Sequence, residues 1–167
     1  GIATVALFKV NENFPGLVPT EALKKSIAYI SSCQNAKGGW GYFNENEAPN
    51  TSISIWQIHS LILAKQNGFA GLEDSIKTNL TWLQKMADKN GVMGYRKPSD
   101  FPYGQNALTA MSGIFWLYEE ELSDNTLEFK IKFQEDLEKI AIAPEKNLNY
   151  YQFYFLTSSL KKLKEKH

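Results

Sequence analysis

The chain contains a glycine-rich turn, Gly38-Gly39-Trp40-Gly41-Tyr42-Phe43, and about fifty residues later a second copy, Gly91-Val92-Met93-Gly94-Tyr95. The first copy leads into residues 51–57 (Thr-Ser-Ile-Ser-Ile-Trp-Gln) and the second into residues 106–111 (Asn-Ala-Leu-Thr-Ala-Met). Each copy follows an amphipathic segment and precedes a strongly apolar one. A repeat of this length, made of two helices and a glycine turn, predicts stacked helical hairpins.

Two outer helices are predicted from apolar stripes at helical spacing. The first begins at Thr20, which we expect to be its N-cap, and ends before the glycine turn. The second spans about residues 72–86. The two stripes consist of Leu23, Ile27 and Ile30 in the first helix and of Ile76, Leu80, Leu83 and Met86 in the second.

The inner helices are apolar over most of their circumference, which is typical of buried helices. One is expected to be capped by Thr51 and Ser52 and closed by Gly68, and the other covers residues 106–118. A third pair is predicted at residues 131–142 and 148–163. The alternation in residues 127–133 also fits a strand, but Phe133, Leu137 and Ile140 continue at helical spacing and favour a helix.

The predicted fold is all-α. Residues 2–10 are interpreted as the end of a helix that belongs to a preceding pair, stopping at Asn11. With the three pairs that follow, this gives a partial α/α toroid of about three and a half antiparallel helical hairpins. We expect residues 1–167 to form one domain of this kind, as an arc or a terminal part of a larger repeat domain.

The composition is that of a soluble globular protein, with 43% apolar and 22% charged residues in a chain of 167. Eighteen basic and eighteen acidic residues cancel, which argues against a nucleic-acid partner because phosphate binding needs a basic surface. A single cysteine, Cys33, excludes an internal disulfide. No apolar run is long enough for a transmembrane segment.

The stretch Gln-Asn-Ala-Lys-Gly-Gly-Trp-Gly-Tyr at residues 34–42, with Asn50-Thr51-Ser52 and Trp56-Gln57 after it, resembles the repeat of the terpenoid cyclase and protein prenyltransferase superfamily. The likeness is strongest to bacterial proteins with prenyltransferase and squalene-oxidase repeats. Residues 147–154 resemble the last inner helix of that group. The resemblance covers nearly the whole chain and implies an α/α toroid.

The catalytic groups of that superfamily do not carry over. Cyclases that protonate an alkene have an acidic motif directly before the Thr of an inner helix. The matching residues before Thr51 are residues 47–50, and the central acid position is Pro49, which cannot donate a proton. In zinc-dependent prenyltransferases a His ligand stands where this chain has Leu108, and Cys33 lacks suitably spaced partner ligands. We therefore expect no catalytic residue, no metal and no cofactor.

The resemblance implies a prenyltransferase-like module that is noncatalytic by itself and has a binding or interaction role. The alternative is a part of an enzyme of isoprenoid (terpenoid cyclase-like) or polysaccharide chemistry whose catalytic acids lie elsewhere. Because each glycine turn leads into an inner helix, the turns and the positive helix ends should meet at one end of the arc. The candidate pocket for an apolar or sugar-like ligand consists of Trp40, Tyr42, Trp56, Tyr95, Asn106 and Tyr150.

Three of these predictions have competing interpretations. The rings of Trp40, Tyr42 and Tyr95 fit simple packing between successive hairpins better than a pocket wall. His59, on an inner helix, fits a core histidine better than a catalytic one. The apolar residues 2–10 lack an outer partner helix, so we expect a homodimer or an upstream domain that completes the ring to cover them.

Overall fold

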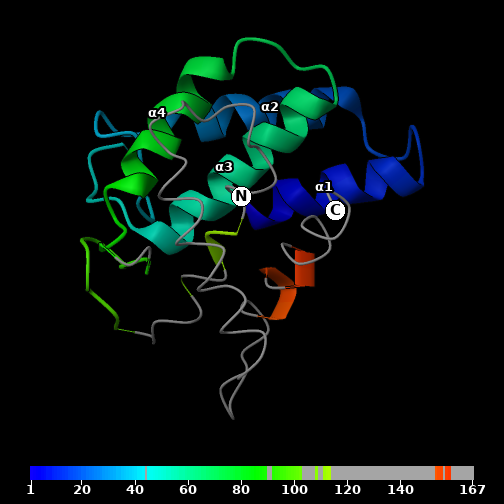
Figure 1. Ribbon diagram of the computed structural model, residues 1–167. Coiled ribbons are helices and arrows are strands. Elements are labelled where there is room, and N and C mark those ends of the chain that lie inside the picture. The colour runs from blue at the N-terminus through cyan, green and yellow to red at the C-terminus, as the bar shows by residue number, and fades with distance from the viewer. Residues whose placement is uncertain are drawn as a thin grey trace. The chain divides into compact units, whose positions relative to one another are not determined.

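The computed structural model describes residues 1–43, 45–89, 92–102, 108, 111–113, 153–155 and 157–158. Its helices are α1 (Ile2–Asn13), α2 (Thr20–Ser32), α3 (Thr51–Gln66) and α4 (Glu73–Gln84), as Figure 1 shows. These described residues form no strand, only an isolated antiparallel bridge between Ala87 and Met93. The prediction of an all-α fold is therefore confirmed. The chain divides into two compact units, Gly1–Trp82 and Leu83–His167, which are described separately.

Helix α1 is longer than predicted. The predicted end at residue 10 is wrong, because the helix continues through Asn11 and Glu12 to Asn13. Two polar contacts support this extra turn: Lys9 Nζ lies 2.8 Å from Glu12 Oε2, and Asn13 Nδ2 donates to the Lys9 carbonyl at 2.8 Å. Polar residues on the exposed side of a helix end its apolar stripe without ending the helix.

Helix α2 buries the predicted stripe Leu23, Ile27 and Ile30 and exposes most of its other side chains. The predicted N-cap is wrong by one residue. Pro19 occupies the cap position with φ −58° and ψ 129°, and Thr20 is already the first helical residue. Proline fixes φ near this value and lacks an N–H group, so it suits the start of a helix.

Helix α3 is buried almost all round, as an inner helix was predicted to be. Ten of its sixteen residues are buried. Its cap is Asn50, not Thr51 or Ser52: Asn50 Oδ1 accepts a hydrogen bond from the Ile53 amide at 3.0 Å. Asparagine is among the strongest capping residues, and its position one residue earlier places Thr51 inside the helix.

The C-terminal end of α3 is closed by Gly68, as predicted. Gly68 has φ +84°, its amide donates to the Lys65 carbonyl, and the Phe69 amide donates to the Ala64 carbonyl at 3.1 Å. These two bonds form a Schellman motif, which often brings an apolar contact with it. Here the Phe69 ring packs edge-on against Phe8 of α1, with 5.9 Å between the ring centroids.

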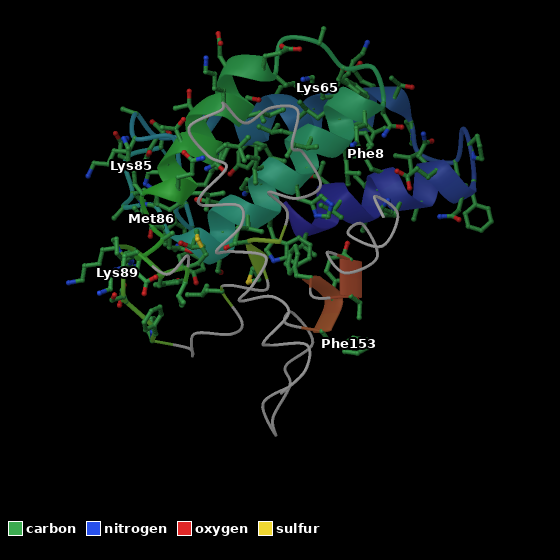
Figure 2. The ribbon with its side chains drawn as sticks, viewed as in Figure 1. Phe8, Lys65, Lys85, Met86, Lys89 and Phe153 are labelled. Carbon is green, nitrogen blue, oxygen red and sulfur yellow. The ribbon has the colours of Figure 1, made fainter. Side chains whose placement is uncertain are left out.

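In the first unit, α1, α2 and α3 contact one another in pairs, and successive helices run in alternating directions (Figure 1). Phe8 is completely buried and lies among the side chains between α1 and α3 (Figure 2). Helix α4 buries Ile76, Leu80 and Leu83 of its predicted stripe, and Met86 is buried just after it. Lys65, Lys85 and Lys89 point away from the ribbon in Figure 2.

The structure repeats with an offset of 53 residues. This offset separates the starts of α2 and α4 (Thr20 and Glu73) and the ends of α1 and α3 (Asn13 and Gln66). It also relates Ile55, which is completely buried, to Leu108, which is 2% exposed. By position in the repeat, α1 is thus an inner helix like α3, and it precedes the first outer helix of the chain.

Of the second predicted inner helix, the structure describes Leu108 and residues 111–113, and the predicted helix at 131–142 lies outside the described residues. Residues 153–155 and 157–158 of the last predicted inner helix are helical, with Tyr154 packed edge-on against Phe155 at 5.1 Å between centroids. Within the part of the chain that the structure describes, no helix combines the length and apolar character that a membrane span requires.

Candidate functional site

The first glycine turn is held together by Asn35. The side-chain Oδ1 of Asn35 accepts hydrogen bonds from the amides of Lys37 (2.9 Å) and Gly39 (3.3 Å), and the Asn35 amide donates to the Gly39 carbonyl at 3.0 Å. The amide nitrogen of its side chain donates to the Glu47 carbonyl at 3.2 Å. One residue thus fixes both ends of the turn and the loop that follows it.

The turn also packs against the middle of α4. The Gly38 carbonyl accepts from Gln34 Nε2 at 2.9 Å and from Asn79 Nδ2 at 2.7 Å. Gly38 has φ +96°, and a Cβ atom placed on it would lie 2.6 Å from the Thr78 carbonyl oxygen. The first glycine of the motif is therefore required both by backbone conformation and by close approach.

Trp40 joins the end of α2 to the start of α3. Its Nε1 donates to the Ile30 carbonyl at 2.7 Å, its amide donates to Ser54 Oγ at 2.9 Å, and its carbonyl accepts from the Asn50 amide at 3.1 Å. The side chain is 1% exposed. Trp40 accordingly offers no open surface to a ligand, and its geometry is that of the packing interpretation.

The two aromatic residues after Trp40 are exposed instead. Tyr42 is 57% exposed and Phe43 is 79% exposed. Their loop is closed by Glu47, whose Oε2 accepts from the Phe43 amide at 2.9 Å. A Cβ atom on Gly41 would collide with the Glu47 side chain, so Gly41 permits this closure. The loop therefore holds two exposed rings beside the buried turn.

Trp56 and His59 lie on the inner helix α3. The Trp56 indole stacks on the His59 ring, with 6.3 Å between centroids and an angle of 24° between the planes. Burial, and to a smaller degree the charge of Lys9, lowers the pKa of His59 to about 4. His59 is consequently neutral near pH 7 and has no proton to give as an imidazolium acid. These properties are those of a core histidine.

Pro49, where the resemblance to cyclases would place an acid, is closely packed. Pro49 is buried, and a Cβ atom on Gly39 would collide with the Pro49 ring. The next residue, Asn50, is completely buried and caps α3. Asn50 and Asn79 each begin an Asn-x-Ser/Thr sequence, the acceptor pattern for N-glycosylation. Asn79 is also completely buried, and its side chain donates to the Gly38 carbonyl of the turn. Neither asparagine is accessible for glycosylation.

The second glycine turn has the same clamp as the first, a pair of hydrogen bonds between the first residue of the turn and the residue four positions later. The Asp88 amide donates to the Val92 carbonyl and the Val92 amide donates to Asp88 Oδ1, both at 3.0 Å. Asp88 and Val92 lie 53 residues after Asn35 and Gly39, which form the same two hydrogen bonds in the first turn. Met93, at the position of Trp40, is completely buried.

Tyr95 differs from its counterpart Tyr42, because it is only 6% exposed. Its amide donates to the Asp100 carbonyl at 2.7 Å, and the Arg96 guanidinium lies 5.7 Å from the centre of its ring. Of the six candidate residues, Trp40, Tyr42 and Trp56 belong to the first compact unit and Tyr95 to the second. Asn106 and Tyr150 lie outside the described residues.

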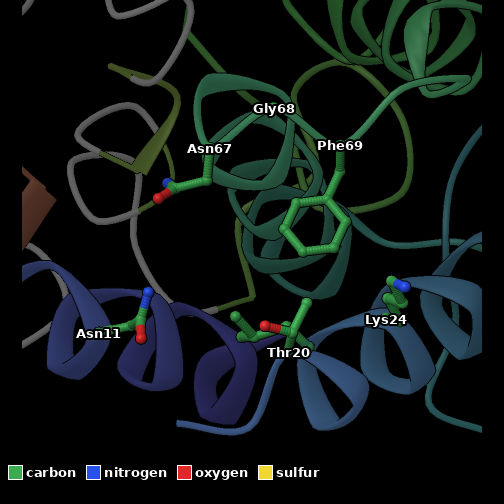
Figure 3. A pocket seen from close by; sticks show the side chains of 7 residues that line it. Asn11, Thr20, Lys24, Asn67, Gly68 and Phe69 are labelled. Atoms are coloured by element: carbon green, nitrogen blue, oxygen red, sulfur yellow. The ribbon is translucent and has the colours of Figure 1, made fainter. Parts of the chain in front are cut away.

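A pocket of about 350 Å³ lies at the opposite end of α3 from the glycine turn. It is formed where α1 and α3 end and α2 begins, and Phe69 and Leu23 supply its apolar part (Figure 3). Its polar side chains are those of Asn11, Thr20, Lys24 and Asn67. The sequence analysis did not predict this pocket, because no sequence motif lies at it and its shape depends on the Schellman turn at Gly68 and Phe69.

Metal ligands do not gather in the described part of the chain: no group of three or more His, Cys, Asp or Glu side chains there could hold a metal ion. Leu108, where the resemblance to zinc-dependent prenyltransferases would place a histidine, is buried. Comparison of the sequence with models of known protein families found no match, and comparison with curated proteins found no significant one.

Proposed function

We propose that the chain is a prenyltransferase-like α/α-toroid module that binds an apolar or sugar-like ligand and is noncatalytic by itself. The observation that carries this proposal is the exposed aromatic pair Tyr42 and Phe43, 57% and 79% exposed on a closed loop. Exposed rings that gather on one loop commonly mark a contact surface, and aromatic faces stack well on isoprenoid chains and on sugar rings.

A neutral ligand fits the start of α3 better than an anionic one. The Asn50 side chain accepts the Ile53 amide, and the Asn50 carbonyl accepts the Ser54 amide at 3.0 Å. The Ile53 and Ser54 amides at this helix start are thereby already bonded, and Asn50 itself is buried. The exposed surface of the preceding loop offers the rings of Tyr42 and Phe43.

A noncatalytic role is supported by Pro49, at the position where the resemblance would place a cyclase acid, and by His59 in the core. Pro49 packs against Gly39 and carries no proton. His59 has a pKa of about 4 because it is buried, so it is not charged at neutral pH. Protonation of an alkene needs a strong, positioned acid, and these two side chains do not supply one.

The test is a calorimetric titration of the purified chain with two probes, farnesol and a gluco-oligosaccharide. We expect Tyr42→Ala and Phe43→Ala each to weaken binding of the preferred probe at least about tenfold, the effect of losing roughly 1.4 kcal/mol. Tyr29→Ala is the matched control, because Tyr29 is an exposed ring (64%) that belongs to α2 and not to the loop. The melting temperature of all three variants should match that of the unchanged chain.

Two results would contradict the proposal. One is binding that is equally strong in Tyr42→Ala, Phe43→Ala and Tyr29→Ala, which would place the ligand elsewhere. The other is conversion of the probe into a product by the purified chain, which would show chemistry in the chain itself.

A further inference from the structure

We propose that the pocket where α1 and α3 end and α2 begins binds a small amphipathic anion, which has an anionic head group on a short apolar chain. Its volume of about 350 Å³ lies at the lower end of the range for small-molecule sites. Lys24 supplies the charge for the head group, and Leu23 and Phe69 supply apolar contact for the chain. This site is separate from the loop with Tyr42 and Phe43, which precedes the start of α3.

Lys24 is the charged group of the pocket. It is the only ionisable residue among the seven that line it. Its ammonium group forms no ion pair within the part of the chain that the structure describes. Glu21 on the same helix does not line the pocket, and Glu12 of α1 is paired with Lys9 at 2.8 Å. An anion in the pocket therefore meets one unpaired positive charge and no carboxylate of a lining residue.

The second repeat has an acid at the position where the first has Thr20. Glu73 and Lys77 lie 53 residues after Thr20 and Lys24. An acid and a lysine four residues apart on a helix are close enough to attract each other. At the position of this acid, Lys24 has a threonine hydroxyl, which can donate a hydrogen bond to an anion. The first repeat therefore leaves its lysine available for a ligand, whereas the second provides it with an acid.

The apolar wall of the pocket is in place without a ligand. Leu23 is 3% exposed. The Phe69 amide donates to the Ala64 carbonyl at 3.1 Å, and the Phe69 ring packs edge-on against Phe8 with 5.9 Å between the centroids. In Figure 3 the Phe69 ring points down toward Thr20. A wall that is already ordered lowers the entropic cost of binding.

Two helices end at the pocket, and the partial negative charges of their ends are reduced by hydrogen bonds. The Val10 carbonyl of α1 accepts the Phe14 amide, and the Leu63 carbonyl of α3 accepts Asn67 Nδ2, both at 2.8 Å. The start of α2 contributes the opposite partial charge, since Pro19 provides no side-chain acceptor to cap it. The full charge of the lysine therefore decides the sign of the charge at the pocket.

The first test is a titration of the isotope-labelled chain with hexanoate and with hexyl phosphate, followed by amide chemical shifts. We expect both anions to shift the Thr20, Gly68 and Phe69 amides to saturation, and the tighter of the two identifies the head group. 1-Hexanol lacks the charge and inorganic phosphate lacks the chain, so each should bind at least about threefold more weakly. If neither anion gives saturable shifts, or either comparison compound binds equally well, the proposal is wrong.

The second test compares Lys24→Gln with its control Lys25→Gln. Both lysines are exposed on α2, but Lys25 does not line the pocket. We expect Lys24→Gln to weaken hexanoate binding at least about threefold, the loss of a partly exposed ion pair, and Lys25→Gln to leave it unchanged. Equal weakening by the two variants would mean general attraction by surface charge and would overturn the proposal.

The third test fills the pocket instead of changing its charge. Thr20 is an exposed lining residue, so the larger side chain of Thr20→Phe should occupy the space of the ligand. We expect hexanoate binding to be lost while the helical circular dichroism stays the same. Undiminished binding would place the ligand elsewhere. Because no test here changes the loop with Tyr42 and Phe43, failure of this proposal and failure of the binding role of that loop are distinguishable.

Discussion

Trp40 shows how one side chain can connect three parts of the chain. Its indole reaches the end of α2, while its main chain bonds to residues at the start of α3. Packing and ligand binding were the two alternatives for this ring, and the sequence did not decide between them. The deciding contacts are with Ile30 and Ser54, 10 and 14 residues away, whose distance in space depends on the fold.

We therefore expect Trp40 to contribute to the stability of the fold. We expect Trp40→Ala to lower the free energy of unfolding by about 3–5 kcal/mol, since it empties a completely packed site. Trp40→Phe should lose less, keeping a ring but not the Nε1 bond. Tyr42→Ala, at an exposed neighbour, should stay within about 0.5 kcal/mol of the unchanged chain. Urea unfolding provides the measurement, and a near-neutral Trp40→Ala would contradict the packing interpretation.

His59 should make stability depend on pH. In the unfolded chain a histidine takes up a proton below about pH 6.5, whereas the folded His59 does so only near its pKa of about 4. The unfolded state thus binds more protons in this window, and stability falls as the pH is lowered through it. Between about pH 6.5 and pH 5 the expected loss is about 2 kcal/mol.

The variant His59→Gln removes the titrating group and should flatten this dependence. Urea unfolding of both chains at several pH values in the window measures it. If the unfolding free energy of His59→Gln falls as steeply as that of the unchanged chain, the pH dependence belongs to other groups.

The helices of the first unit were predictable because each has a distinct apolar pattern. The stripe of α2 and the all-round apolar surface of α3 were both confirmed. Their starts were misplaced because Thr and Ser are good caps in general, while Pro19 and Asn50 stood one residue earlier and fitted better. The end of α1 was missed because exposed polar residues resemble a loop when only the sequence is considered.

Two glycines at turns near α3 allow a controlled comparison. Gly38 and Gly68 have φ +96° and +84°, but only Gly38 has atoms in the space of a Cβ, with the Thr78 oxygen at 2.6 Å. Gly68→Ala should cost about 1–2 kcal/mol from backbone strain alone. Gly38→Ala adds a collision with backbone and should cost clearly more. Chemical denaturation of both variants checks this, and equal losses would mean that the turn moves away from α4 easily.

At the scale of the molecule, the repeat was the most reliable information in the sequence for the residues that the structure describes. It predicted alternating outer and inner helices, and the structure adds the offset of 53 residues and the shared clamp at Asn35 and Asp88. The candidate site was less predictable. Tyr42 and Tyr95 hold the same place in the motif, yet one is 57% and the other 6% exposed, because their loops close differently.

The shared clamp predicts which substitutions the repeat tolerates. Asp88 Oδ1 accepts the Val92 amide as Asn35 Oδ1 accepts the Gly39 amide. Asn35→Asp keeps this acceptor and loses the bond to the Glu47 carbonyl, whereas Asn35→Ala loses all the side-chain bonds. Asp should therefore be about 1 kcal/mol less destabilising than Ala at this position, as measured by thermal unfolding. Equal destabilisation by both would show that the acceptor is unimportant.

The recurrence of one clamp at a fixed offset has an evolutionary consequence. A tandem duplication of residues 35–87 would join Ala87 to a second Asn35, and Asn35 already occupies the place that Asp88 has in the original order. The new junction would fall in a turn that either residue can hold, and it would cut no helix. An in-frame duplication of this segment would therefore lengthen the protein by one whole helical hairpin.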